Sequence, residues 1–480
     1  MHDINKVRRA IISSLPDEVA AESTPQLRSG EIYFPPSHLK ALRLESSLVV
    51  GGRGVGKTFW TKVLGNRELK DTLIRLLPDM RNTEVKIGFS FSEDIIAYPT
   101  RNLFSQLLQS GFDPEIIWTS VVVRWLANVL NKSVPTGSWD DTARWVKEHP
   151  EKEALLFHDA NERFQKMGKR GLIIFDSLDR TSNDWETMNR LSQGLLKMIL
   201  RLKGFGALYG KVFFREDQLT NTAMNFPDAS KLQATRCDST WQLHDLHGLL
   251  WQSLCNAPDA NGSILRKVYK TYDDNLTNDN GVWRISDAAM RQGELQKSLF
   301  HSLSGPYMGK DKRRGVPYIW TVSHLADSNQ RTSPRSFLVA IKAASMDSLE
   351  KYFTSYDEFP LHYESIKRGV QKASSVRVRE ISEDYPWVEL LFEPLQGRFN
   401  VPVDFSIIEN LWQEAFPGGI GKQEKLPPQS DGYGWGGVRK QLEHLGLCEV
   451  MRDGRVNMPD LYRVAFRIGR KGGVRPVTDR

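Results

Sequence analysis

Cysteine is scarce in this sequence of 480 residues, which contains three in all. Cys237, Cys255 and Cys448 are far apart, and no two of them form a CxxC pair. This number and spacing favour neither a disulfide framework nor a zinc site, so we expect three reduced cysteines. The sequence also lacks an HExxH motif and a histidine cluster that would indicate another metal centre.

Apolar runs long enough to cross a membrane are missing as well. No uncharged apolar run approaches the roughly 20 residues of a membrane helix. The first 14 residues mix charged and apolar side chains and lack the apolar core and cleavage site of a signal peptide. We therefore expect a cytoplasmic protein with no membrane partner. Because the chain is too long for one ordinary core and has no internal repeat, we expect several different domains.

The formal net charge is +7, and much of it lies at the C-terminal end. Residues 461–480 contain six cationic side chains and one acidic side chain, a net charge of +5. Such a segment could contact phosphate groups, or it could be a solvated basic tail. Charge alone leaves both interpretations open.

One motif carries most of the functional information. Residues 51–58 match G-x-x-x-x-G-K-[ST] in full, between an apolar strand expected at residues 46–50 and a helix expected from residue 59. Glycines let the backbone aim successive N–H groups at an anion, and the helix start adds its positive end. The expected nucleotide-binding residues are Gly51, Gly52, Arg53, Gly54, Val55, Gly56, Lys57 and Thr58.

The same motif predicts the bound species. Lys57 is expected to reach the β- and γ-phosphates of ATP, with GTP the less favoured alternative, and the Thr58 hydroxyl to bind Mg²⁺. A second metal-binding acid is expected after a strand next to the phosphate loop. Residues 172–175 form an apolar run that ends at Asp176, which we predict to hold the metal. Asp179, three residues later, is predicted to polarise the attacking water.

These residues resemble a known family. The string Phe-Asp-Ser-Leu-Asp-Arg at residues 175–180 resembles the signature of the AAA+/STAND division of P-loop ATPases. Ordinary AAA+ machines carry a glutamate where this chain has Ser177. The resemblance therefore implies an ATPase that is slow or stimulated by a partner, acting as a switch or assembly factor rather than as a fast motor.

Two arginines extend the resemblance. Arg215 follows the strand expected at residues 208–214, a position similar to the sensor-1 position of this division. Arg335 begins a helix in a segment similar to the sensor-2 segment of origin-recognition-type and KAP-type bacterial ATPases. The resemblance implies that both reach the nucleotide, and the alternative is that each is a surface or ion-paired arginine. Arg180 and Arg215 are candidates for an arginine that acts on a neighbouring subunit.

Strands that alternate with helices predict an α/β fold with a parallel sheet. We expect a P-loop NTPase core with a helical insertion and a helical lid, followed by a winged-helix domain. A further strand is expected at residues 84–90, the tryptophans of the insertion are expected to be core anchors, and residues 257–316 are expected to be irregular. The expected domains are residues 1–30, an N-terminal helix and linker; 31–238, the core with its insertion at about 94–167; 239–400, the lid and connecting region; and 401–480, the winged helix with the basic tail.

The winged-helix expectation rests on residues after 400. Helices are expected at residues 405–415 and 435–445, followed by a hairpin over residues 448–459 whose turn contains Asp-Gly. Such a module could bind double-stranded DNA or dock on a protein effector, and a homo-oligomer is a further possibility. Analogy with related bacterial ATPases adds a role in antiphage defence. The alternatives are a small-molecule phosphotransferase, or a DNA-binding regulator with a weakly active nucleotide site.

Overall fold

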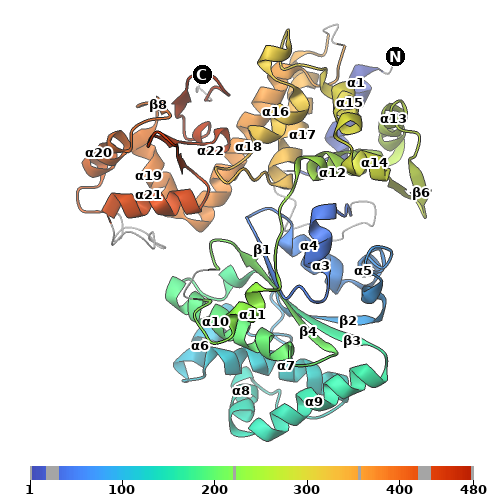
Figure 1. Cartoon of the computed structure of the whole chain (residues 1–480), viewed down its shortest axis with the longest axis vertical. Helices are drawn as coiled ribbons and strands as arrows, with labels where there is room; N and C mark the ends of the chain where they lie inside the picture. Colours follow the sequence, from blue (N-terminus) through green and yellow to red (C-terminus); the bar gives the residue numbers. More distant parts are fainter. Residues whose placement is uncertain (1–2, 18–31, 220–222, 355–357, 420–433, 477–480) are drawn as a thin grey trace. The chain divides into compact units, whose positions relative to one another are not determined.

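The computed structural model describes residues 3–17, 32–219, 223–354, 358–419 and 434–476. The chain divides into two compact units. We call residues His38–Thr240 the sheet unit, and residues Met1–Ser37 together with Trp241–Arg480 the helical unit. Figure 1 shows the elements of each unit.

A five-stranded sheet with the order β2-β3-β4-β1-β5 forms the centre of the sheet unit. All of its neighbouring strands run parallel, which confirms the predicted α/β class. The sequence did not predict β5, because a run of three residues with one buried side chain carries no readable pattern. The strands are β1 (Leu48–Gly51), β2 (Thr83–Phe89), β3 (Arg170–Phe175), β4 (Leu208–Arg215) and β5 (Arg236–Asp238).

Helices connect these strands, as parallel pairing requires. Four of them, α6 to α9, lie between β2 and β3, where the sequence predicts a helical insertion. The helices of the sheet unit are α3 (Leu39–Leu42), α4 (Lys57–Gly65), α5 (Arg67–Asp71), α6 (Arg101–Gln109), α7 (Pro114–Leu130), α8 (Trp139–Glu148), α9 (Pro150–Lys166), α10 (Trp185–Leu202) and α11 (Ala229–Gln233), with 3-10 turns η3 (Pro78–Asn82) and η4 (Leu178–Arg180).

The helices between β2 and β3 contribute to the central core of the sheet unit. Trp118 of α7 is fully buried, and its ring centroid lies 5.8 Å from that of Phe89 and 5.5 Å from that of Phe175. Trp125 and Trp139 belong to the same apolar cluster, and Trp145 packs against it. The prediction that these tryptophans are core anchors is therefore confirmed. Aromatic pairs of this kind also fix the position of α7 on the sheet.

The helical unit contains the N-terminal helix and the chain after residue 240. Its helices are α1 (Ile4–Ser14), α12 (Leu243–Cys255), α13 (Asp259–Lys270), α14 (Asp287–Arg291), α15 (Gly293–Ser304), α16 (Pro317–Ser323), α17 (Pro334–Lys351), α18 (Tyr363–Asp384), α19 (Pro386–Phe392), α20 (Phe405–Ala415), α21 (Gly434–His444) and α22 (Asp460–Arg463), with 3-10 turns η5 (Lys312–Arg314) and η6 (Glu393–Leu395). Because α1 packs on α13 and α17, it does not stand apart as the separate N-terminal segment that we expected.

Residues 257–316 are more regular than the sequence suggested. They form α13, α14 and α15, with a hairpin of β6 (Thr277–Asp279) and β7 (Val282–Arg284), so the expectation of an irregular segment is wrong. The polar composition of this segment obscures a narrow apolar face. Helix α13 buries Leu265 and Tyr269, which are four residues apart, while its last turn contains the charged residues Lys267 and Lys270. Such a stripe is enough to hold a short helix against α1 and α12.

The C-terminal elements follow the predicted order. Helices α20 and α21 lie at the expected positions, and β9 (Glu449–Val450) pairs antiparallel with β10 (Val456–Asn457). In addition β8 (Asn400–Val401) pairs in parallel with β11 (Gly469–Arg470), and α22 packs on α18. Whether these elements form a winged-helix domain beginning near residue 400 stays a prediction. Residues 420–433, between α20 and α21, lie outside the described residues.

The basic C-terminal segment is not simply a solvated tail. Arg463 is fully buried, where its Nε donates to Asp460 Oδ1 at 2.7 Å and its Nη2 donates to the carbonyl of Val474 at 2.7 Å. Burial of a guanidinium requires such partners. Exposed cations of this segment include Arg467, Arg470, Lys471 and Arg475, whereas Asp479 and Arg480 lie outside the described residues.

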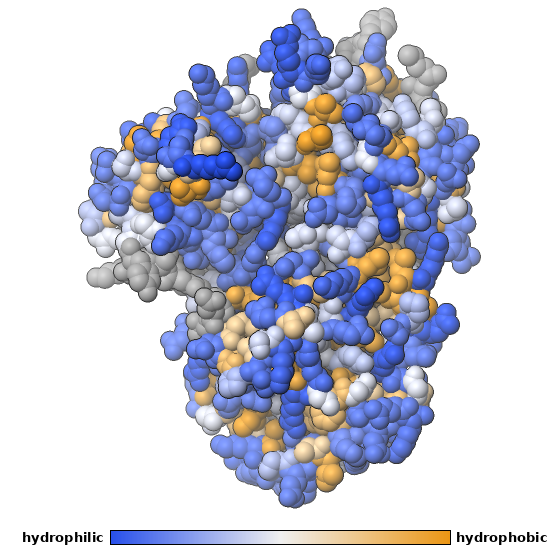
Figure 2. All heavy atoms as spheres, viewed as in Figure 1, coloured by the Kyte–Doolittle hydropathy of each residue, from blue (hydrophilic) through white to orange (hydrophobic). Residues whose placement is uncertain are grey.

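In the view of Figure 2, hydrophobic side chains lie in scattered patches among hydrophilic ones. Within the described residues, every helix falls short of the length and apolar character needed to cross a membrane. The three cysteines are free and buried.

Candidate functional site

The phosphate loop connects β1 to α4 at the carboxyl edge of the sheet. Gly54 and Gly56 have φ angles of 79° and 101°, a region that other residues seldom adopt. At Gly51 a Cβ atom would lie 2.7 Å from Val55 Cγ2, so a larger residue would displace the loop. Two glycines of the motif are therefore favoured by their backbone conformation, and Gly51 is favoured by its close contact with Val55. The nine-residue helix α4 begins at Lys57, directly after them.

Lys57 lies against the inside of this loop. Its ammonium group donates to the carbonyl oxygens of Gly51 at 2.9 Å and of Gly52 at 2.8 Å. Loss of hydration, together with the neighbouring charge of Arg215, lowers the pKa of Lys57 to about 8. The carboxylates of Asp176 and Asp179 act in the opposite direction, so Lys57 has charges of both signs around it.

Asp176 and Thr58 meet at the base of the loop. Asp176 directly follows β3, is 1% exposed and interacts with the Thr58 side chain. Burial raises the pKa of Asp176, while the neighbouring Thr58 side chain and the charge of Lys57 lower it. A hydroxyl and a carboxylate are hard oxygen donors of the type that Mg²⁺ prefers. The structure thus brings together the two residues that the sequence predicts to hold the metal.

The order of the strands that carry Thr58 and Asp176 differs from the one that we expected. We expected Asp176 to follow a strand next to β1, but β4 lies between β1 and β3. Because all these strands are parallel, their carboxyl ends share one edge, and a residue two strands away can still reach Thr58.

Asp179 returns toward the same edge through a tight turn. Ser177 has a φ of 58°, a left-handed conformation that reverses the chain before η4. The charge of Asp179 then acts on both Lys57 and Asp176. This places Asp179 in the candidate site, and its role toward water stays a prediction.

Arg215 is the last residue of β4 and lies at the same edge of the sheet. Its Cα is the register partner of Gly51, and its Nη2 lies 2.7 Å from Asp217 Oδ2. Both side chains are 12% exposed. Sequence reasoning missed Asp217, although an acid two residues after a strand-ending arginine is a readable signal for this pair.

Ser239 is a second residue that the sequence analysis missed. It follows β5, and its backbone N–H donates to the carbonyl of Val50 at 2.7 Å. Its hydroxyl is buried and has no hydrogen-bond partner among the described residues. A Cβ on Gly51 would approach the Ser239 carbonyl oxygen to 3.1 Å. The signal in the sequence was weak, because β5 itself was not predicted.

Arg180 is held at the rim of this edge. Its guanidinium carbon lies 3.5 Å from the ring centroid of Phe91, and its carbonyl accepts from Arg101 Nε at 3.1 Å. Stacking on an aromatic ring fixes the side chain while leaving its charge available.

Arg335 lies in the helical unit, at the start of α17. Its guanidinium is ion-paired with Glu380 of α18, as the alternative interpretation of this residue expected. Glu380 also lies 3.3 Å from Nη1 of Arg377, whose Nε lies 3.2 Å from the Tyr462 hydroxyl. Within its own unit, Arg335 is thus part of a polar chain from α17 to α22, and its reach toward a nucleotide stays a prediction.

Comparisons with known proteins add little to this geometry. No protein-family model and no curated protein matches the chain. Among solved structures, the ORC2 protein of Aeropyrum pernix in its ADPNP-ADP complexes is 11% identical, with a TM-score of 0.40, over 91% of this chain and 94% of that one. Its ADP form is 12% identical, with a TM-score of 0.28, over 94% and 92%. At these scores the likeness does not say what this chain binds.

Proposed function

We propose that the sheet unit binds ATP, or less favourably GTP, together with Mg²⁺, and hydrolyses it slowly as a molecular switch. The observation that carries the proposal is that the buried Asp176 interacts with Thr58 and with Lys57, whose ammonium group lies on the carbonyls of the glycine loop. A glycine turn with an incidental lysine would have no reason to place a buried carboxylate there. The cost of burying that charge is understandable where a cation is to be bound.

In this proposal each residue at the sheet edge has a distinct task. The N–H groups of the loop and the start of α4 receive the phosphates. Lys57 exchanges its two carbonyl acceptors for phosphate oxygens. Thr58 and Asp176 hold Mg²⁺, which when bound neutralises charge on the phosphates.

Asp179 is the residue that we assign to the attacking water. It lies in the candidate site without being the carboxylate that contacts Thr58, so the two acids can have separate tasks. Ser177 cannot act as a base where AAA+ machines carry glutamate. We therefore propose slow hydrolysis, or hydrolysis stimulated by a partner. Arg215 and Arg335 are proposed sensors of the nucleotide, in keeping with the resemblance to the AAA+/STAND division.

The helical unit is the proposed output of the switch. Helices α20 and α21 and the hairpin β9–β10 supply the parts of a winged helix, and exposed cations such as Lys440 and Lys471 could contact phosphates. We propose that this unit acts on double-stranded DNA or on a protein effector. Membership of the AAA+/STAND division, assembly into a homo-oligomer and a role in bacterial antiphage defence rest on the sequence resemblance.

Steady-state ATP hydrolysis by the purified chain, with and without double-stranded DNA, tests the proposal. We expect slow, Mg²⁺-dependent turnover that Lys57→Ala abolishes, and a higher rate with DNA if the helical unit senses it. Phosphate transfer to a small acceptor in place of water would instead identify a phosphotransferase. DNA binding whose affinity does not change when nucleotide is added would indicate a DNA-binding regulator with a weakly active nucleotide site.

A further inference from the structure

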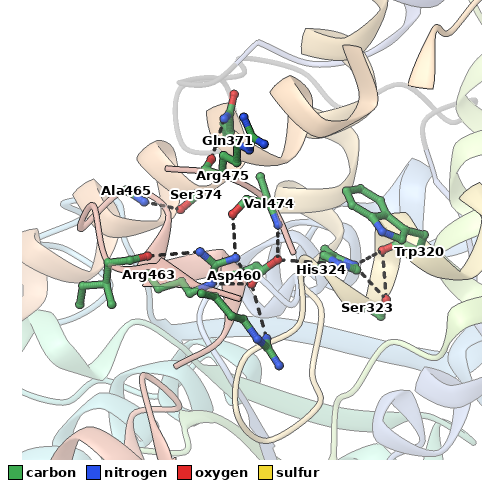
Figure 3. Close-up of polar contacts among 12 residues, drawn as sticks. Trp320, Ser323, His324, Gln371, Ser374, Asp460, Arg463, Ala465, Val474 and Arg475 are labelled. Carbon is green, nitrogen blue, oxygen red and sulfur yellow. Dashed lines mark hydrogen bonds and ion pairs between the residues drawn. The ribbon is translucent and has the colours of Figure 1, made fainter. Parts of the chain in front are cut away.

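A cavity of about 420 Å³ lies within the helical unit, apart from the phosphate loop. It is bounded by residues 323–330, which link α16 to α17, and by residues of β9, β10, α22 and β11. The volume is within the range of small-molecule sites. Figure 3 shows part of its wall, where His324 and Arg463 converge on Asp460.

One buried acceptor in this wall lacks a donor. Asn457 is 7% exposed, and its Nδ2 donates to Glu449 Oε1 at 2.7 Å. This bond fixes the orientation of the carboxamide, because the reversed amide would bring its oxygen against a carboxylate. Asn457 Oδ1 then has no hydrogen-bond partner among the described residues. A buried carbonyl of this kind is satisfied by a ligand or a water that donates to it.

His324 and Asp460 provide two further acceptors in the wall of the cavity. The imidazole stacks on Trp320 with ring centroids 3.9 Å apart, and its Nδ1 lies 2.9 Å from the Trp320 carbonyl oxygen. Nδ1 must therefore carry the hydrogen, and burial lowers the pKa of His324, which favours the neutral ring. Nε2 is then an acceptor 3.7 Å from Asp460 Oδ2, itself an acceptor. Asp460 already accepts from Arg463 Nε at 2.7 Å and from the Val474 N–H at 3.1 Å, so a donor placed here would newly satisfy His324 Nε2 and add a bond to Asp460.

Cations reach the same cavity from another element. Arg470 and Lys471, at the end of β11, both line it and are exposed. Arg470 Nη1 lies 3.6 Å from Asp460 Oδ1, and Lys471 has no ion pair among the described residues. Because Arg463 already compensates Asp460, these two cations balance the remaining carboxylates of Asp327 and Glu449.

We propose that this cavity binds a small zwitterion of the amino-acid class. Its ammonium group donates to the acceptors of Asn457 and of the His324–Asp460 pair, and its carboxylate pairs with Arg470 and Lys471. A cavity whose charges of both signs balance favours a ligand of no net charge over a phosphate or a metal ion. The inference is independent of nucleotide binding by the sheet unit.

A ligand bound in this cavity would contact two segments of the helical unit that already touch each other. The Ser328 N–H donates to the carbonyl of Gly446 at 3.0 Å, so the segment 323–330 already touches the C-terminal elements. A ligand that contacts both sides would strengthen this contact and fix β9–β11 relative to the start of α17. Binding would therefore stabilise the helical unit by mass action.

Calorimetry and thermal shift on the full chain test the proposal, with glycine, alanine, serine, threonine, asparagine and glutamine, which carry no net charge, each added alone. We expect at least one of them to bind with one-to-one stoichiometry and to raise the melting temperature. Arg470→Gln and Lys471→Gln should each weaken it by about tenfold, as expected for loss of a charge-assisted hydrogen bond. Both side chains are exposed, so both variants should fold. Lys310→Gln, an exposed lysine outside the cavity, is the matched control and should leave affinity unchanged.

Derivatives of the best binder test the zwitterion itself. N-acetylation removes the ammonium group and amidation removes the carboxylate, so each should abolish binding. Absence of binding by all six at about 10 mM, or equal affinity in Arg470→Gln and the parent chain, would overturn the proposal. Binding of AMP in their place, weakened by Arg470→Gln, would overturn it in favour of a nucleotide site.

Discussion

Asp176 and Thr58 interact with each other although their strands are not neighbours in the sheet. Asp176 follows β3 and Thr58 lies in α4 after β1, with β4 between the two strands. The contact joins residues 118 positions apart in the sequence and depends on parallel strands ending at one edge. The contact also offsets part of the cost of burying the Asp176 carboxylate, because the Thr58 side chain and the Lys57 ammonium both favour its charged form.

Asp176→Asn should uncouple ATP binding from Mg²⁺. The substitution keeps the size of the side chain but removes its charge, so we expect the apparent affinity for Mg²⁺ to fall by about 10- to 100-fold. A titration of Mg²⁺ at fixed ATP measures this. Asp238→Asn is the matched control, because Asp238 ends β5 at the same edge and pairs with Arg236 at the surface. Equal Mg²⁺ dependence in all three proteins would remove Asp176 from the metal site.

Asp179→Asn should separate binding from hydrolysis. If Asp179 orients the water, turnover should fall by about 100-fold or more while affinity for ATP changes by less than about twofold. Single-turnover hydrolysis and calorimetric binding give the two quantities. Asp228→Asn, an exposed aspartate paired with Lys231, should change neither. Normal turnover in the Asp179 variant would assign the water to another residue.

Acid should destabilise the sheet unit through His38. This side chain ends the turn η2 (Pro36–His38) and is fully buried; its Nδ1 accepts from Trp60 Nε1 at 3.0 Å, and its Nε2 donates to the Thr240 carbonyl at 3.2 Å. Burial lowers its pKa from 6.5 to about 4. Between these two pH values His38 is therefore protonated in the unfolded chain and neutral in the folded chain. The free energy of unfolding should therefore decrease as the pH falls from about 6.5 to about 4, by roughly 3 kcal/mol at most.

Urea unfolding at a series of pH values tests this effect. His38→Gln should be less stable at pH 7, because it loses both hydrogen bonds, but should show a weaker pH dependence below pH 6.5. His158→Gln, at an exposed site on α9, should retain the parent dependence. Parallel curves for His38→Gln and the parent chain would show that another group accounts for the acid sensitivity.

Salt dependence should reveal whether the C-terminal cations contact DNA. Lys440 of α21 and Lys471 after β11 are exposed, so their removal should not affect folding. If each touches a phosphate, Lys440→Gln and Lys471→Gln should each reduce the slope of log affinity against log salt by about one. Fluorescence anisotropy with a double-stranded oligonucleotide measures the slope. Lys166→Gln on α9 is the control, and an unchanged slope in both test variants would exclude these lysines from the contact.

Local patterns predicted much of the candidate site. The glycine motif placed the loop and α4, and the apolar run before Asp176 placed β3, because each signal lies within a few consecutive residues. The order of the strands could not be predicted, since it depends on pairing between residues far apart. Burial of Arg463 was also hidden, because its carbonyl partners at Ile468 and Val474 come from a later turn of the chain.

The central claim is that residues 51–58 bind a nucleoside triphosphate, and calorimetric titration of ATP with Mg²⁺ tests it most directly. We predict one site per chain, with affinity reduced at least about tenfold by Lys57→Ala, because the ammonium contributes charge-assisted hydrogen bonds to phosphate. Lys62→Ala, on the same helix α4, should bind like the parent chain. Circular dichroism verifies that each variant is folded. Equal affinity for ATP in Lys57→Ala and the parent chain would contradict the account.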